Sequence, residues 1–518
     1  MRRSLIALTG LACTALAALA VEPAHFGTWG VDLSAMDRTV QPGDNFFLYT
    51  DGNWLRTAQI APDRSSTGAF LNLRILSETR MKEIVAELDA KPYDQLSADE
   101  KKLRNFYDAY VDQKQIDARG LGPAQKDLTY IASLKTPDDV ATAMGTPRFK
   151  EDGPYNVGIG VDQKRPTAYE VDLAQSGLGM PDRDYYLRDD KEIVATRDAY
   201  KKYLATMLGF AGATDAEKRA DAVYALELQM AKVEWPAADR RDATKTYNPM
   251  SIADLEGSAP GFPWHAYFAA SAIPETSPHG ARRVVIAEKS AFPELAKIFA
   301  ATPVEVWRDY LTIRYLHAFA DELPKFVDDA NFAFYGSVVQ GQPQELDRAT
   351  RGVHLLDANL GEALGQLYTA KYFPPSAKAA ADRLVGNLLK AYDADIRVLP
   401  WMTPETRIKA LEKLHKFTPH IGYPDKWRDY SAYAITRDDL IGDVQGGAAF
   451  EWNRELKRLD DPVDKNEWAM SPPTVNAYYD PTVNGIFFPA AILRSRRRRR
   501  GELWWYRRRD RPRNQSRI

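Results

Sequence analysis

Apolar residues recur at intervals of three and four positions along most of the chain. This period places them on one face of an α-helix, which a globular core then covers. The pattern is clearest in six stretches: 77–89, 196–210, 293–300, 304–322, 361–370 and 376–397. It predicts a mainly α protein.

Three helix starts are also visible in the sequence. Ser97 precedes Glu100 at the spacing of a capping box, in which each of the two side chains bonds the other residue's backbone N–H. Thr214 and Glu217 repeat this spacing. Thr403 stands before a proline, a residue favoured in the first helical turn. We expect helices to begin at these three points.

Strand patterns are fewer and shorter. Tyr155–Val161 and Tyr169–Leu173 alternate or run apolar on either side of a polar stretch, which predicts a hairpin on the surface of the helical body. Val475–Tyr479 and Gly485–Pro489 flank the turn-rich residues 480–484, which predicts a second hairpin.

The composition is that of a globular protein with an unusual C-terminal tail. Of the 518 residues, 45% are hydrophobic and 27% are charged, and the length predicts two or three domains or a lobed body. The formal net charge is −2, but residues 494–518 hold twelve arginines against Glu502 and Asp510, a net of +10. Residues 1–493 therefore carry −12 and form an acidic body.

The N-terminus has the pattern of a secretory signal peptide. Arg2 and Arg3 precede the apolar stretch Leu5–Leu19, and an Ala-x-Ala cleavage site ends at Ala20. We expect residues 1–20 to be removed on export to the periplasm or the extracellular space. The alternative is an uncleaved membrane anchor. No later window holds the roughly eighteen apolar residues of a transmembrane helix.

The residues by themselves reveal no active site. Cys13, the single cysteine, lies in the signal, which excludes disulfides and cysteine-based zinc sites from the mature chain. The seven histidines include no pair at i and i+4, the spacing that lets two imidazoles on one helix bind zinc. His415 and His420, five positions apart, are interpreted as surface or core residues. Serine-elbow and phosphate-loop patterns are also absent.

Several longer strings carry more information than the composition does. They include GDNFFLY from Gly43, the run Gln175–Leu187, the run Ile421–Trp427, VNAYY from Val475 and FPAAIL from Phe488. These strings resemble the neprilysin-like zinc metallopeptidase family, which includes neprilysin, endothelin-converting enzyme and bacterial oligopeptidase O. The resemblance spans about residues 34–493.

The resemblance implies a large helical lobe and an incomplete thermolysin-like α+β catalytic lobe, which enclose a chamber for small peptides. Residues 21–70 would be an N-terminal segment associated with the catalytic lobe, residues 71–400 a helical cover domain, and residues 401–493 a partial catalytic lobe with the substrate-binding hairpin. With that lobe incomplete, we expect the hairpin to expose an apolar face at Ile486–Phe488.

Three residues match substrate-binding positions of the family. The resemblance implies that Asn476 and Ala477 hold the backbone of a peptide substrate, which agrees with the ability of a strand edge and an amide side chain to pair with an extended peptide. Arg74 resembles an arginine near the substrate carboxylate. The residues alone leave another interpretation open for Asn476, which is that it caps a turn.

The zinc motif that the family requires is missing from the sequence. His-Glu-x-x-His, a later glutamate ligand and a later histidine would be needed, and none of them follows Leu493. We therefore expect no catalytic residue, no metal ligand and no bound cofactor in this chain, with zinc confined to intact relatives. The predicted function is that of an inactive member of a zinc metalloendopeptidase family. The alternatives are a non-catalytic peptide-binding or decoy protein and a poorly folded gene product.

The arginine-rich tail, residues 494–518, is interpreted as the product of a frameshift. Codons that encode Pro512–Ile518, read one base forward, can spell His-Glu-Ile-Ser-His-Gly, which has the form of the missing motif. The alternatives are a patch for nucleic acid or anionic lipid and a plain solvated arm. We expect no nucleic-acid partner, because the protein is predicted to be exported, and the sequence gives no oligomeric state.

Overall fold

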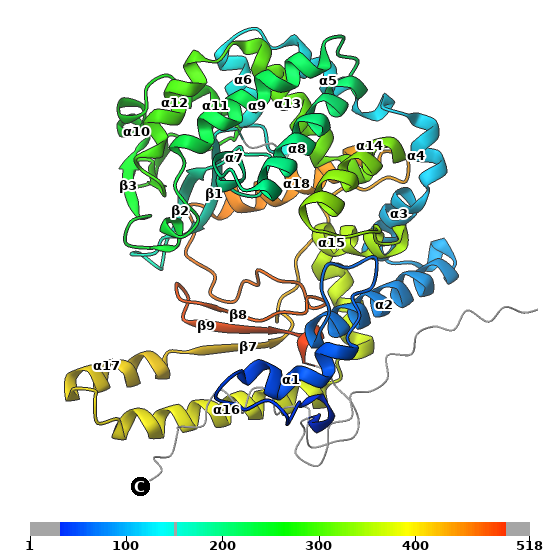
Figure 1. Ribbon diagram of the computed structural model, residues 1–518. Coiled ribbons are helices and arrows are strands. Elements are labelled where there is room, and N and C mark those ends of the chain that lie inside the picture. Colours follow the sequence, from blue (N-terminus) through cyan, green and yellow to red (C-terminus); the bar gives the residue numbers. More distant parts are fainter. Residues whose placement is uncertain (1–31, 150–152, 494–518) are drawn as a thin grey trace, which may run out of the picture. The chain divides into compact units, whose positions relative to one another are not determined.

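Figure 1 shows the computed structural model of the protein, which describes residues 32–149 and 153–493. The predicted signal peptide, residues 1–20, and the arginine-rich tail, residues 494–518, lie outside the described residues. The described chain forms two compact units. The small unit contains residues 32–59 and 67–72, and the large unit contains residues 60–66, 73–149 and 153–493.

The small unit is built around α1 (Phe46–Thr57) and the short 3-10 helix η1 (Leu33–Ala35). The Asn45 side chain caps α1 by accepting a hydrogen bond from the third backbone N–H of the helix. Asn53 donates a hydrogen bond to the carbonyl oxygen of Met36 at 2.6 Å, which ties α1 to the preceding segment.

Helices dominate the rest of the chain, and each of the six helical stretches predicted from the sequence lies wholly or mainly in one of them. The predicted fold class, mainly α with a second part of mixed α and β structure, is confirmed. No helix in the described part of the chain is both long and apolar enough to cross a membrane. The helices are α2 (Ala69–Ala90), α3 (Ala98–Val111), α4 (Gln113–Arg119), α5 (Gln125–Ser133), α6 (Pro137–Met144), α7 (Asp184–Leu187), α8 (Lys191–Phe210), α9 (Ala216–Val233), α10 (Ile252–Ser258), α11 (Trp264–Ala270), α12 (Ala291–Ala301), α13 (Val304–Ala318), α14 (Lys325–Asn331), α15 (Arg348–Tyr372), α16 (Pro375–Val398), α17 (Pro404–His415) and α18 (Leu440–Arg458).

Two of the three predicted helix starts are confirmed. Ser97 and Glu100 form the capping box of α3, and Thr403 caps α17 by accepting a hydrogen bond from the third helical N–H at 3.2 Å. The capping box at Thr214 is wrong. α9 begins one residue later, with Asp215 at the capping position, so that Glu217 is its second residue rather than its third.

A four-stranded sheet in the order β1-β2-β6-β3 lies against the helices of the large unit. The antiparallel pair of β1 and β2 confirms the first predicted hairpin, but its placement on the surface is wrong. β2 also pairs in parallel with β6, and its residues Val171 and Leu173 are buried. The strands are β1 (Tyr155–Val161), β2 (Tyr169–Gln175), β3 (Asn248–Ser251) and β6 (Arg283–Ile286), with a separate short pair β4 (Thr276–Ser277) and β5 (Gly280–Ala281).

An aromatic core anchors one end of the β1–β2 hairpin. The Tyr155 ring lies 4.6–4.8 Å, centroid to centroid, from the rings of Phe262, Trp264 and Phe292. Its hydroxyl donates a hydrogen bond to the backbone carbonyl of Phe292 at 2.7 Å. The opposite end of the hairpin, with Gly160 and Tyr169, is therefore held in a fixed place beside the site described below.

A second sheet of three strands has the order β7-β9-β8, with β7 (Thr418–Gly422) parallel and β8 (Tyr478–Asp480) antiparallel to β9 (Gly485–Pro489). Its β8–β9 pair confirms the second predicted hairpin. The expectation of an uncovered apolar face is wrong for Phe487 and Phe488, whose exposed fractions are 1% and 8%. Phe487 is stacked between the rings of His420 and Tyr478, at centroid distances of 4.2 and 4.5 Å.

Residues 401–493 contain this sheet and also a helix that packs on the helical elements. α18 contacts α3 and the 3-10 turn η4 (Pro147–Phe149). The Trp452 indole of α18 donates a hydrogen bond to the carbonyl oxygen of Ser271 at 2.7 Å. The residues before and after position 400 belong to the same compact unit. The predicted boundary between a cover domain and a partial catalytic lobe stays a prediction.

Candidate peptide-binding site

The two residues predicted to hold a peptide backbone stand at the end of a sheet. Asn476 and Ala477 immediately precede β8, the terminal strand in the order β7-β9-β8. Asn476 is exposed, and its side-chain oxygen accepts a hydrogen bond from the N–H of Ala477 at 2.8 Å. A terminal strand has one row of backbone groups that is not used within its own sheet. The geometry therefore suits the addition of an extended peptide.

The segment Ser471–Thr474, which leads into this strand, is fastened to α15. Two glycines of the helix permit the close approach: a Cβ on Gly361 would lie 2.9 Å from the Cβ of Ser471, and a Cβ on Gly365 would lie 2.6 Å from the Cδ of Pro472. The Ser471 hydroxyl donates a hydrogen bond to Asp357 at 2.6 Å. Glycine at positions 361 and 365, one helical turn apart, thus lets the segment before β8 pack directly against α15.

A cavity of about 660 Å³ lies beside β8. Tyr478 and Asp480 of β8 line it, together with residues of β1, β2, α15, α18 and the loop 464–471. Asn476, Ala477 and Arg74 are not among the lining residues. Arg74 is exposed near the start of α2. The structure therefore brings the strand of the predicted site to the cavity, and the three predicted residues themselves stay predictions.

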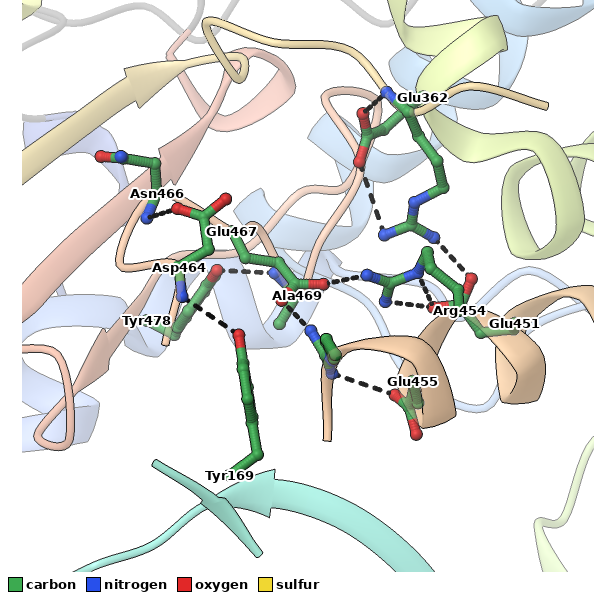
Figure 2. Close-up of polar contacts among 12 residues, drawn as sticks. Tyr169, Glu362, Glu451, Arg454, Glu455, Asp464, Asn466, Glu467, Ala469 and Tyr478 are labelled. Atoms are coloured by element: carbon green, nitrogen blue, oxygen red, sulfur yellow. Dashed lines mark hydrogen bonds and ion pairs between the residues drawn. The ribbon is translucent and has the colours of Figure 1, made fainter. Parts of the chain in front are cut away.

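The cavity is crossed by an unbroken chain of ion pairs in which four glutamates alternate with three arginines. Figure 2 shows its centre, where Arg454 lies between Glu451 and Glu467. The order of the chain is Glu362, Arg428, Glu451, Arg454, Glu467, Arg458 and Glu455. The nitrogen-to-oxygen distance is 3.5 Å between Arg428 and Glu362, 2.8 Å between Arg428 and Glu451, and 3.3 Å between Arg458 and Glu455. Each guanidinium therefore contacts two carboxylates.

α18 supplies much of this chain because its residues recur at helical intervals. Glu451, Arg454, Glu455 and Arg458 are spaced three and four apart, so they lie along one face of the helix. Their other partners lie outside the helix: Arg428 comes from the loop before α18 and also pairs with Glu362 of α15, and Glu467 comes from the loop after α18. The ion-pair chain thus joins α15, α18 and the loop around the cavity.

Burial changes the proton affinity of several cavity groups. It raises the pKa of Glu455, against the neighbouring charge of Arg458. It lowers the pKa of Arg458, with Arg454 acting in the same direction. Burial also raises the pKa of Asp357 to about 6, against the hydrogen bond from Ser471.

The described residues do not fit the zinc that the family resemblance implies. In residues 32–149 and 153–493, the one group of three potential ligand side chains is Asp321, Asp328 and Glu345, with no imidazole. One guanidinium nitrogen of Arg351 lies 2.8–3.0 Å from oxygens of all three. An arginine already fills the place of a cation there, so the group does not form a zinc site.

The chain belongs to peptidase family M13, whose family model matches residues 42–424. Human endothelin-converting enzyme 1 is 26% identical over 485 residues, which cover 89% of this chain and 62% of that protein. A homologue of this enzyme in Locusta migratoria is also 26% identical, over 89% of this chain and 66% of its own length. The chain thus spans about three fifths of the length of these curated relatives.

Solved structures agree with this assignment. The inhibitor complex of the Mycobacterium tuberculosis zinc metalloprotease ZMP1 is 37% identical, with a TM-score of 0.83, over 90% of this chain and 70% of that one. The structure of PepO from Lactobacillus rhamnosis HN001 is 23% identical, with a TM-score of 0.77, over 88% of this chain and 71% of that one. The second likeness supports the fold alone.

The ion-pair chain is not predicted by the sequence pattern. One signal was available, since Glu451, Arg454, Glu455 and Arg458 have the spacing of helical ion pairs. That signal is typical of a solvated helix face, and it did not reveal Glu362 or Glu467 as partners.

Proposed function

We propose that the chain binds small peptides in an extended conformation along β8, as the substrate-binding part of the M13 zinc metallopeptidase architecture. The observation that carries the proposal is the position of β8, a terminal strand whose residues Tyr478 and Asp480 line a cavity of about 660 Å³. Backbone groups on the free side of such a strand give affinity for any extended chain, and side-chain pockets beside it give selectivity.

We further propose that these 518 residues bind peptides without cleaving them. The sequence contains no His-Glu-x-x-His. The potential ligand group in the described part of the chain has no histidine and is occupied by Arg351. A chain that keeps a peptide site and has no metal centre would act as a non-catalytic binding or decoy protein.

Binding and hydrolysis can be measured separately on the purified chain. Fluorescence anisotropy with labelled nonapeptides reports binding, metal analysis reports zinc content, and mass spectrometry of the peptides with and without a chelator reports cleavage. We expect binding, no stoichiometric zinc and no cleavage. Hydrolysis that a chelator abolishes, with homogeneous protein, would contradict the proposed lack of activity.

The contribution of Asn476 is tested with a matched pair of variants. Asn476→Ala removes a side chain expected to bond the peptide backbone, so the affinity should fall about tenfold, as for one or two hydrogen bonds. Asn387→Ala, at an exposed position of α16, is the control and should leave the affinity unchanged. Equal affinity for both variants would count against binding along this strand.

We also propose that the protein is exported, with residues 1–20 as its signal peptide. The sequence pattern of the N-terminus supports this proposal. The mass of the protein isolated from its native cells tests it. A mature chain that begins at Val21 is expected, whereas an intact Met1 in all of the protein would favour a membrane anchor or no export.

A further inference from the structure

The cavity lining contains more negative charge than its ion-pair chain uses. In addition to the four glutamates and three arginines, Asp357, Asp464 and Asp480 line the cavity. Among the lining residues in the described part of the chain, seven carboxylates against three guanidiniums leave an excess of four negative charges, and none is a lysine or histidine.

None of these three aspartates has a basic partner among the ion pairs of the described residues. Asp480 accepts hydrogen bonds from the N–H and hydroxyl of Thr482, at 2.8 and 2.6 Å. Asp464 accepts one from the N–H of Asn466 at 2.9 Å. These bonds fix the carboxylates in place and leave their negative charge uncompensated.

The three arginines are not available to an incoming anion. Arg428, Arg454 and Arg458 each contact two glutamates, so that a carboxylate of a peptide would have to displace one of them. Displacement would leave a half-buried glutamate without its partner, which is costly. An acidic peptide therefore meets the excess negative charge without a compensating contact.

We propose that the cavity beside β8 selects cationic peptides, those with lysine or arginine side chains, over neutral and acidic ones. The proposal rests on the proposed peptide binding along β8. Tyr478 and Asp480, two positions apart, lie on one face of the strand and both line the cavity. Alternate side chains of a peptide paired with β8 face the same space, where a basic side chain is near Asp480 and in the field of the other carboxylates.

The test compares three labelled nonapeptides of one sequence in which the same three positions are lysine, glutamine or glutamate. At low ionic strength the lysine peptide should bind at least about tenfold more tightly than the glutamine peptide, and the glutamate peptide should bind least tightly. The differences should shrink as salt is added, because exposed charges are screened. This comparison uses the unmodified chain and requires no variant to fold.

A matched pair of variants locates the effect. Asp480→Asn removes one cavity charge and should lower the lysine-to-glutamate affinity ratio about threefold or more. The control is Asp242→Asn, because Asp242 makes the same contacts with Thr244, at 2.9 and 2.6 Å, and is not among the lining residues. The ratio should not change in the control.

The outcomes separate this inference from the proposed function. Equal binding of all three peptides would overturn the charge selection and leave peptide binding in place. Tighter binding of the glutamate peptide would also overturn it. Failure of every peptide to bind would overturn the proposed function, and the selection with it. An equal loss of selectivity in the Asp480 and Asp242 variants would overturn the assignment to the cavity.

Discussion

Replacement of Gly365 by alanine should destabilise the protein, although the same change favours most helices. Alanine is about 1 kcal/mol better than glycine in a helix interior. Here the new Cβ would lie 2.6 Å from the Cδ and 2.7 Å from the Cγ of Pro472. Pro472 cannot retreat easily, because its carbonyl oxygen accepts a hydrogen bond from Ala491 and the next carbonyl accepts one from Ser77.

The size of the effect follows from a comparison with Gly386 of α16. A Cβ there would meet nothing within 4 Å, so Gly386→Ala should gain the helix preference alone, about 1 kcal/mol. Overpacking at Gly365 costs about 1–3 kcal/mol. The free energies of unfolding of the two variants should differ by this amount, with the Gly365 variant the less stable.

Urea unfolding followed by circular dichroism measures both variants against the unmodified chain, and peptide anisotropy measures the consequence for the site. Because Ser471–Thr474 leads into β8, the Gly365 variant should also bind peptides less tightly, whereas the Gly386 variant should bind normally. If Gly365→Ala stabilises the chain as much as Gly386→Ala does, the close contact between α15 and this segment is refuted.

Three further predictions concern stability. Arg454→Met should cost about 1–2 kcal/mol in urea unfolding, between the costs of exposed and of fully buried pairs, because Glu451 and Glu467 each lose one of their two guanidinium partners. Arg437→Met, at an exposed ion pair, should cost under about 0.5 kcal/mol. Burial lowers the pKa of His317 to about 4, so this histidine takes up a proton in the unfolded chain at a higher pH than in the folded chain. The free energy of unfolding should therefore fall by up to about 3 kcal/mol as the pH falls from about 6.5 to 4, and His317→Gln should remove this contribution in unfolding curves measured at a series of pH values. Chymotrypsin should cut at Trp401, which is 73% exposed, yet the two fragments should co-elute in gel filtration, because α18 packs on α3 and Ser471–Thr474 on α15.

Each of these expectations has a clear contrary result. Equal costs for the Arg454 and Arg437 variants would mean that the ion-pair chain is no more than a surface feature. An unchanged pH dependence in the His317 variant would show that this imidazole is not buried in its neutral form. Separation of the chymotryptic fragments under native conditions would show that residues 401–493 fold apart from the helical elements.

The sequence predicted the elements whose signals are local. The capping residues of α3 and α17 act within one helical turn, and the β8–β9 hairpin has its turn residues between its strands. The Thr214 start was wrong by one residue, since the chosen spacing matched a capping box that the backbone does not form. Local patterns therefore gave the type of an element more reliably than its first residue.

The errors on the two hairpins share a cause. β2 has a second neighbour in β6, which lies more than a hundred positions further along the chain, and Phe487 is covered by His420 of β7. Neither contact can be predicted from the alternation of apolar and polar residues, because that alternation indicates which face of a strand is buried but not which element covers it. A hairpin predicted in isolation thus looked more exposed than it is.

The ion-pair chain of the cavity contributes both to the stability of the fold and to the proposed selection of cationic peptides. Six ion pairs through three guanidiniums hold the four glutamates of the chain together, and they tie α15, α18 and the following loop to one another. Because the three guanidiniums are already paired with these glutamates, they are not available to bind the carboxylates of an acidic peptide. A substitution that removes one of these guanidiniums, such as Arg454→Met, weakens the fold and also adds one uncompensated negative charge to the cavity. Loss of stability and stronger preference for cationic peptides should therefore appear together in that variant, whereas a defect confined to folding would weaken the binding of all three test peptides alike.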